Sequence, residues 1–347
     1  MSQIFEAIKE LLVFANLQML ISNRRLLFKS VLVTQKAKLN VPIVRWLTSS
    51  NGSVLDRWRT EMESKKILTH DTLIASPLNL LANTLNDQTV PYRHAVLPAS
   101  DTEIPPTWHH VYFPPRTPED DLALDGYETD FFPPPPFVQR MWAGATLVWN
   151  TENPLRAGQQ VTMATTLDKA EYRQQGRVGE SVFVHLGKNI SNNQGWSMKE
   201  ERSLVYLTDQ SISSGPTRSI RSNKKPSFSR TMTPSSILLF RYSALTFNSH
   251  MIHFDHTYAT TQEHHPACLV HGPLSSTLMM GLLTSHIQSL DQKPKFRLFR
   301  YKCLLPLYVN QPLTLCGRES ASDPKIYELW VVNHEGNLAV KGSVELA

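Results

Sequence analysis

Residues 269–283 read LVHGPLSSTLMMGLL, and the fold that the sequence predicts is built around this stretch. Gly272 and Pro273 mark the start of a helix, because the first helical turn does not need the N–H group that proline lacks. Apolar and small residues then recur at the spacing of a helix with one buried face. They are Leu274, Thr277, Leu278, Gly281 and Leu282. The stretch therefore predicts a buried helix.

Alternating apolar and polar residues follow this helix. The alternation predicts strands at 299–303, 326–331 and 338–346, and residues 334–337 (HEGN) form the turn expected between the last two. A short strand is also predicted before the helix, at 237–242. One buried helix wrapped by an antiparallel sheet is an α+β arrangement.

The first half of the chain repeats this pattern. An exposed helix is expected at 54–66, and a second helix begins at Ser76-Pro77 with leucines at helical spacing. A proline-rich loop then covers 98–136. Period-two alternation follows and predicts strands at 161–167, 182–186 and 204–208. The helix-and-sheet unit is thus expected twice.

The ends of these two units are marked by composition. Residues 209–230 are Ser-rich and basic, which is typical of a linker or loop, and they divide a first half at 50–208 from a second at 231–347. Residues 19–50 mix basic, hydroxyl and apolar side chains without one Asp or Glu. That composition indicates a mitochondrial targeting segment, expected at 1–49. The alternative is a basic amphipathic helix that belongs to the fold.

Overall composition excludes several classes of protein. The 347 residues carry 35 Lys+Arg against 30 Asp+Glu, and the excess is too small to indicate a nucleic-acid surface. No apolar run approaches the ~20 residues of a membrane span. Three scattered cysteines without a CxxC pair argue against a disulfide framework or a zinc ribbon. Neither a GxGxxG element nor a P-loop occurs, so nucleotide-dependent chemistry has no support.

Histidine is concentrated in one short stretch. Six of the 13 histidines lie within 22 residues; they are His250, His253, His256, His264, His265 and His271. Histidine exchanges a proton near neutral pH, which suggests acid–base catalysis. A metal site is the alternative, because positions 250, 253 and 256 would share one face of a helix. The familiar catalytic zinc spacings do not occur, however. We expect His256, His264 and His265 to be structural, and Cys268 to be packed in the core.

Residues 242–255 (YSALTFNSHMIHFD), followed by LVHGPL at 269–274, resemble the active-site region of MaoC-like hydratases and dehydratases with the hot-dog fold. The likeness is greatest to fungal mitochondrial 3-hydroxyacyl-thioester dehydratases and mesaconyl-CoA hydratases. Residues 140–144, 154–158 and 188–191 resemble the non-catalytic first half of the same proteins. The resemblance implies a double hot-dog fold, in which two antiparallel sheets each wrap a central helix and the second half is catalytic.

The active-site pattern of that family is Asp, any residue, Asn, Pro, an aliphatic residue and His. Laid on this chain, the pattern places its histidine on His253 and its carboxylate position on Asn248. The resemblance implies that His253 takes the α-proton of a 3-hydroxyacyl thioester and returns it to the departing hydroxyl. Asn248 would hold that hydroxyl, although it has no proton to transfer. The N–H of Gly272 would meet the thioester oxygen, with His250 and His271 completing the substrate-binding set.

The implied substrates are thioesters of acyl-carrier protein or CoA, with neither a metal nor a redox cofactor. A C4-dicarboxylyl-CoA hydratase is the first alternative; it needs a cation near the acyl end, where Met251 replaces the usual Arg and Arg241 could compensate. A metal-dependent hydrolase and a non-catalytic acyl-binding protein are the others. The two halves could form a pseudo-dimer within one chain or pair again as a homodimer.

Overall fold

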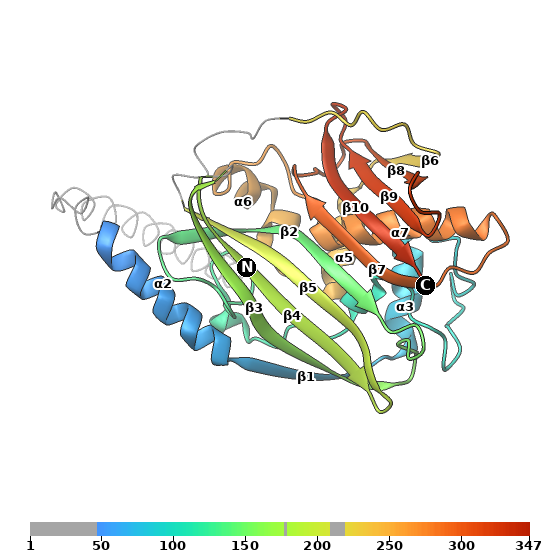
Figure 1. The fold of residues 1–347 in the computed structure, drawn as a ribbon, viewed down its shortest axis with the longest axis horizontal. Coiled ribbons are helices and arrows are strands. Elements are labelled where there is room, and N and C mark those ends of the chain that lie inside the picture. Colours follow the sequence, from blue (N-terminus) through green and yellow to red (C-terminus); the bar gives the residue numbers. More distant parts are fainter. Residues whose placement is uncertain (1–46, 177–178, 209–218) are drawn as a thin grey trace, which may run out of the picture. The chain divides into compact units, whose positions relative to one another are not determined.

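Ten strands carry the architecture of the computed structural model, which describes residues 47–176, 179–208 and 219–347. The first half contributes β1 Lys66–Thr72, β2 Phe137–Trp149, β3 Gln160–Gly176, β4 Gly179–Asn192 and β5 Gly195–Thr208. The second half contributes β6 Phe228–Met232, β7 Phe296–Cys303, β8 Leu313–Glu319, β9 Ile326–Val332 and β10 Leu338–Leu346. The strands pair antiparallel in one sheet, in the order β1-β3-β4-β5-β2-β7-β10-β9-β8-β6 (Figure 1).

The two halves of this sheet meet where β2 pairs with β7. The pairing runs from Gly144 opposite Lys302 to Val148 opposite Leu298. It satisfies N–H and C=O groups that two separate sheets would leave open along their edges. The two predicted sheets are therefore halves of one continuous sheet, and the predicted α+β class is confirmed.

Five helices accompany the sheet in the part of the chain that the structure describes. They are α2 Leu47–Ser64, α3 Ala75–Leu85, α5 Ser236–Thr246, α6 His256–Thr261 and α7 Gly272–Gln288. Short 3-10 turns include η2 Trp108–Val111 and η4 Met251–His253. The helix predicted from 272 is thus confirmed as α7, and the helices expected near 54–66 and 76–85 are confirmed as α2 and α3.

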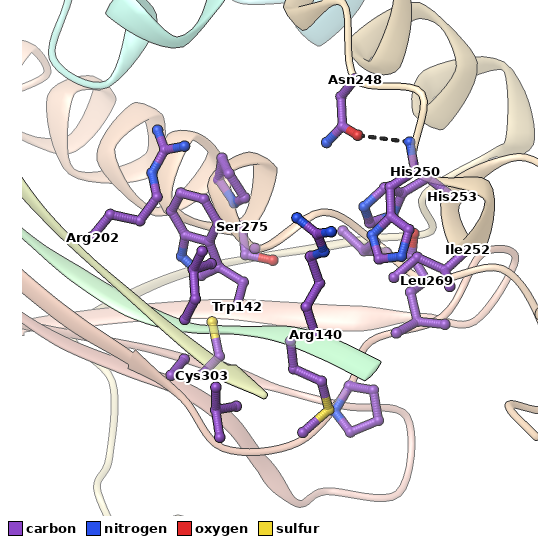
Figure 2. A pocket seen from close by; sticks show the side chains of 18 of the residues that line it. Arg140, Trp142, Arg202, Asn248, His250, Ile252, His253, Leu269, Ser275 and Cys303 are labelled. Carbon is purple, nitrogen blue, oxygen red and sulfur yellow. Dashed lines mark hydrogen bonds between the residues drawn. The ribbon is translucent and has the colours of Figure 1, made fainter. Parts of the chain in front are cut away.

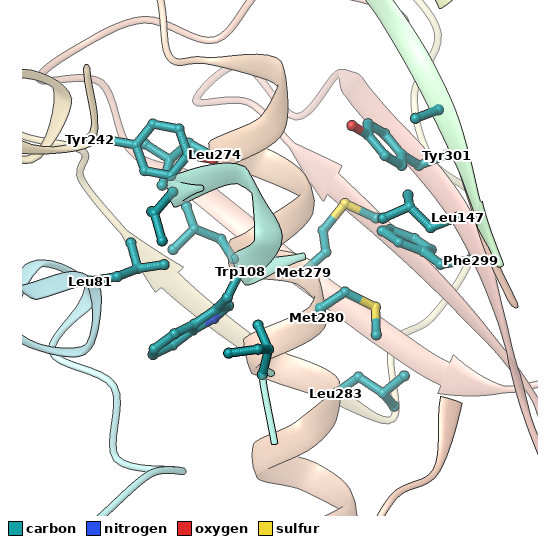
Figure 3. Close-up of a cluster of buried hydrophobic side chains, with 14 of the residues drawn as sticks. Leu81, Trp108, Leu147, Tyr242, Leu274, Met279, Met280, Leu283, Phe299 and Tyr301 are labelled. Carbon is teal, nitrogen blue, oxygen red and sulfur yellow. The ribbon is translucent and has the colours of Figure 1, made fainter. Parts of the chain in front are cut away.

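The central helix is α7, which is buried on almost every side. Met279 and Leu283 belong to the same core cluster as Phe299 of the sheet, and Leu274 joins Trp108 of η2 in it (Figure 3). A helix that is apolar all round is typical of a core position. Each fully buried Leu or Met contributes about 1.5–3 kcal/mol relative to an exposed one, so this helix anchors the second half.

The first half is organised differently from its predicted form. Its helix α3 packs against α5 and η2, and the buried Leu78 and Leu81 join the core cluster of α7. The inner surface of β4 and β5 instead lines a cavity. A second cluster forms on strands β3, β4 and β5 with Phe131 and Phe137, and α2 packs against it. The predicted fold places a central helix beside these strands. The space beside β4 and β5 is instead part of the cavity.

One predicted element is wrong. Residues 237–242, expected to form a strand, belong to helix α5. The run ILLF at 237–240 fits either a buried strand or a buried helix by periodicity alone. The side chain of Ser235 accepts a hydrogen bond from the N–H of Leu238 at 3.1 Å, and this N-cap fixes the helix.

The predicted boundaries have mixed outcomes. Residues 55–347 group into one compact unit that contains strands of both halves. The predicted targeting segment lies outside the described residues, apart from 47–49 at the start of α2. Of the predicted linker 209–230, residues 209–218 lie outside them as well, and strand β6 begins at Phe228. Among the helices that are described, none is long and apolar enough to span a bilayer.

Candidate functional site

A cavity of about 1350 Å³ lies between the first-half strands and the helices of the second half. Strands β2, β4 and β5 line it from one side, and the segments around α5, η4 and the start of α7 line it from the other. Its wall includes Asn248, His250, His253 and Gly272, four of the five predicted site residues. Figure 2 shows the two histidines and Asn248 grouped beside Arg140, with Arg202 further along the wall near Trp142.

His253 is buried at the end of η4, with its ring fixed by one hydrogen bond. Its Nδ1 lies 2.9 Å from the carbonyl oxygen of Leu269, which can only accept, so Nδ1 carries the proton. Nε2 is left with a lone pair. Burial lowers the pKa of His253 to about 3, and the nearby His250 adds to this effect. His253 is therefore a neutral imidazole at neutral pH and has the protonation state of a general base.

His271 supports this ring from behind. The rings of His253 and His271 stack at a centroid distance of 3.6 Å, and Nε2 of His271 lies 2.8 Å from Oγ of Ser243. Burial holds the pKa of His271 well below its usual range, and the neighbouring His253 adds to this effect. His271 is fully buried as the residue before α7. Its position fits a role in holding His253 rather than the predicted contact with substrate.

Asn248 follows the end of α5 and faces the cavity. Its Oδ1 accepts a hydrogen bond of 3.0 Å from the backbone N–H of His250, drawn as a dashed line in Figure 2. That bond consumes the acceptor end of the amide and leaves the Nδ2 group as a donor. Asn248 can therefore hold a substrate hydroxyl by donating to its oxygen.

Gly272 is the first residue of α7, where backbone N–H groups have no partner within the helix. The helix dipole adds a partial positive charge at this end. A Cβ atom at this position would lie 2.5 Å from Cδ1 of Trp142, so a larger residue would collide with that ring. The indole is itself held by a 3.0 Å hydrogen bond from its Nε1 to the hydroxyl of Tyr301. Glycine therefore allows the indole of Trp142 to pack directly against this end of the helix.

The other clustered histidines have different positions. His256 begins α6 and is exposed, whereas His264 and His265 line the cavity and His265 lies 3.8 Å from Glu263. The predicted helix carrying His250, His253 and His256 on one face does not form, because η4 ends at His253. That metal-binding alternative loses its geometric basis. Cys268 is buried, in agreement with its predicted place in the core.

Two carboxylates near His250 were missed by the sequence analysis. Asp125 Oδ2 lies 3.5 Å from Nε2 of His250, and Glu263 Oε1 lies 3.7 Å from the same nitrogen. Arg140 donates from Nε to Asp125 at 3.0 Å. All four side chains are buried. These positions are far apart along the chain, so no local motif contains them. The family resemblance of residues 140–144, which includes Arg140, was the only sequence signal for this group.

A second polar cluster lines the cavity on β4, β5 and η2. Arg202 donates to both oxygens of Glu200, at 2.9 and 3.1 Å, and His109 Nε2 lies 3.2 Å from the same carboxylate. His110 lies close enough for these two histidines and Glu200 to be considered as metal ligands. However, both oxygens of Glu200 are already bonded to a guanidinium, which would repel a bound cation.

The same cluster has a strong positive component. The ammonium group of Lys188 also lines the cavity, and its pKa is lowered to about 8, first by burial and then by Arg202. Arg202 lies over the ring of Trp142 at 4.5 Å, so one indole separates it from Gly272. Lys188 and Arg202 share this part of the wall with the carboxylates of Glu200 and Glu128. Both cations are placed where they could pair with an anionic group of a substrate.

Comparisons with known proteins identify the family of this chain. A family model described as hydroxyacyl-thioester dehydratase type 2 matches residues 107–309. A mesaconyl-C(4)-CoA hydratase of Chloroflexus aurantiacus is 34% identical over 251 residues, 72% of this chain and 86% of the relative. The mitochondrial hydroxyacyl-thioester dehydratase type 2 of Schizosaccharomyces pombe is 29% identical over 292 residues, 77% of this chain and 93% of the relative.

Solved structures with the same architecture are more distant in sequence. A MaoC-like dehydratase superposes with a TM-score of 0.61 at 11% identity, covering 82% of this chain and 98% of that one. A MaoC-like dehydratase from Phytophthora capsici gives 0.57 at 13% identity, covering 84% and 97%. These likenesses confirm the predicted hot-dog fold. By its sequence and its fold, the chain belongs to the hydroxyacyl-thioester dehydratase type 2 family and is a hydro-lyase.

Proposed function

We propose that this hydro-lyase interconverts 3-hydroxyacyl and trans-2-enoyl thioesters, with His253 as the base at the α-carbon. The observation that carries the proposal is the state of this imidazole. Its Nδ1 is committed to the Leu269 carbonyl and its low pKa keeps Nε2 unprotonated, on the wall of a cavity that also holds a helix N-terminus. A buried neutral base beside an oxyanion site suits proton removal next to a thioester carbonyl.

The proposed reaction follows from these positions. The thioester oxygen accepts from the N–H of Gly272, which stabilises the negative charge that develops when the α-proton leaves. Nε2 of His253 takes that proton. The electron pair then forms the double bond as the β-hydroxyl leaves, held by the amide of Asn248. In the simplest form, His253 returns the proton to the hydroxyl, and hydration runs the same steps backwards.

The carrier and the location belong to the proposal as well. We propose that the acyl group is carried on CoA or acyl-carrier protein, and that the reaction serves mitochondrial fatty-acid synthesis. Support comes from the mitochondrial relative of Schizosaccharomyces pombe and from the basic segment at 19–50, which contains no Asp or Glu.

Hydration of trans-2-enoyl thioesters tests the proposed reaction. The full chain is incubated with crotonyl-CoA, with trans-2-decenoyl-CoA and with the corresponding acyl-carrier-protein thioesters. Loss of the enoyl absorbance is followed. We expect turnover of at least one thioester and no response to a chelator. Failure of every thioester with a folded sample would contradict the proposal, and the acyl-binding alternative would then lead.

A second candidate, hydration of a C4-dicarboxylyl-CoA, is favoured by the cations in the cavity. Arg241, which the sequence suggested as the partner of the extra carboxylate, is exposed on α5 and does not line the cavity. Lys188 and Arg202 do line it. A substrate carboxylate could pair with these cations through charge-assisted hydrogen bonds, whereas an uncharged acyl chain could not.

Replacing Lys188 with methionine tests this candidate. We expect KM for mesaconyl-C4-CoA to rise about 10–100-fold, because a hydrogen bond between charged groups contributes about 1.5–3 kcal/mol. Crotonyl-CoA, which lacks the carboxylate, should be hydrated with its KM unchanged. The matched control is Lys341→Met, since Lys341 is exposed on β10. An equal change in KM for both substrates would argue against a carboxylate subsite.

A further inference from the structure

His250 occupies an unusual position between the base and two buried carboxylates. On one side, its ring lies edge-on to the ring of His253 at a centroid distance of 5.6 Å. On the other side, Nε2 faces Asp125 at 3.5 Å and Glu263 at 3.7 Å. The family pattern has no histidine at this place. The ring also lines the cavity, so it can reach a bound substrate.

The charges around His250 are unbalanced unless a histidine is protonated. Asp125 is neutralised by Arg140. Glu263 is only 7% exposed, and its hydrogen bonds come from the neutral groups of Gln139, at 2.6 Å, and Tyr258, at 3.3 Å. Within the described residues, Glu263 forms no ion pair with lysine or arginine. A buried carboxylate requires a compensating positive charge, and its ionisable neighbours are His250 and His265.

Of these two histidines, His250 is the better site for the proton. It faces both carboxylates, whereas His265 faces Glu263 alone, at 3.8 Å. Burial by itself would raise the pKa of Glu263, but its contacts with His250 and Gln139 outweigh burial and lower it. The carboxylate thus stays ionised beside the ring of His250.

We propose that His250, whose Nε2 faces the buried carboxylates of Asp125 and Glu263, is the general acid that protonates the leaving hydroxyl during dehydration. This inference rests on the proposed function and revises its proton path. Asn248 stands where the family pattern has a carboxylate and has no proton to give. In this proposal the proton comes from His250, two residues further along the chain, and Glu263 positions the ring of His250.

The step balances in protons and electrons. In dehydration, Nε2 of His253 takes the α-proton, the C–H electron pair becomes the double bond, and the β-carbon–oxygen bond breaks. The imidazolium of His250 gives one proton to the departing oxygen and water is released. His253 is then protonated and His250 neutral, and one proton passes between them, directly or through solvent.

A pair of substrates with different leaving groups separates the acid from the base. 3-Hydroxybutyryl-CoA and 3-chlorobutyryl-CoA both give crotonyl-CoA. Chloride leaves without taking up a proton, whereas the hydroxyl group must be protonated so that it leaves as water. We expect His250→Gln to lower kcat for dehydration by about 10²–10⁴-fold while chloride elimination changes little. Glu263→Gln should shift the two rates in the same selective way, to a smaller extent. His253→Gln should abolish both reactions.

The control is His256→Gln, because His256 is exposed at the start of α6. An equal loss of both reactions in His250→Gln would overturn the inference, since it would indicate damage to the site rather than loss of an acid. Full dehydration activity in that variant would overturn it too. A wild-type protein that acts neither on these substrates nor on the longer-chain and acyl-carrier-protein thioesters would instead disprove the proposed function itself, so the two failures are distinguishable.

Discussion

Replacing His253 with alanine should lower kcat for dehydration of 3-hydroxybutyryl-CoA by about 10²–10⁴-fold, the usual contribution of a general acid–base residue. KM should change little, because the proposed contacts with the thioester oxygen and the hydroxyl come from the end of α7 and from Asn248. The wild-type rate should also not fall through protonation of His253 between pH 8 and pH 5. A base with a pKa lowered to about 3 stays neutral throughout that range and is lost only when the pH falls further. Initial rates across this pH range test both points.

Two observations would contradict the role of His253. One is a variant that keeps more than half of the wild-type kcat. The other is a wild-type kcat/KM with an acid limb near the ordinary histidine pKa that disappears in the variant. The substitution His256→Ala provides the matched control, because it removes an exposed imidazole three residues away.

The largest expected effect on stability comes from Glu200→Gln. Glu200 is 1% exposed and bonds Arg202 through both oxygens. Removing one partner of a buried ion pair leaves the other charge uncompensated, which costs about 3–5 kcal/mol. Here the uncompensated guanidinium would also face Lys188. We expect the free energy of unfolding, measured by urea titration at pH 7, to fall by that amount.

The pH dependence of this effect has a definite sign. Burial would raise the pKa of Glu200, but Arg202 and His109 outweigh burial and hold it well below the usual range. A carboxyl with a lowered folded-state pKa stabilises the protein above its unfolded pKa and loses that contribution as the pH falls. The difference between wild type and Glu200→Gln should therefore shrink below about pH 4.5. Glu201→Gln, at the exposed neighbouring position, should change stability by less than about 0.5 kcal/mol. An equal loss in both variants would show that the ion pair is not the cause.

The fold was predictable where the pattern is local. The spacing of leucines after Pro273 predicted α7, and strict alternation predicted β9 and β10. The run at 237–240 was misinterpreted, because four apolar residues fit a strand and a helix equally well. Strand β2 was missed as an element, since it follows the proline-rich loop without a clear alternation. Its pairing with β7 joins residues about 150 positions apart, which no local pattern specifies.

The site also contains residues that a local motif identifies and residues that only the fold brings together. Asn248, His253 and Gly272 lie within 25 residues, so one motif could identify them together. Asp125 and Glu263 approach His250 only through the fold. Lys188 entered the sequence analysis only through the family resemblance at 188–191, and Arg202 not at all, because their place in a cavity depends on the helix arrangement of the first half. The resemblance also assigned His271 to substrate binding, because sequence order does not show which of two stacked rings faces the cavity.

The most direct test of the central claim is hydration of crotonyl-CoA in D2O, followed by mass spectrometry of the product. The wild-type full chain should form 3-hydroxybutyryl-CoA with one deuterium at the α-carbon, because the proton delivered there comes from an imidazole in exchange with solvent. His253→Ala should form almost none of this product. Unchanged deuterium incorporation by the variant would contradict the assignment of His253 as the group that transfers the α-proton.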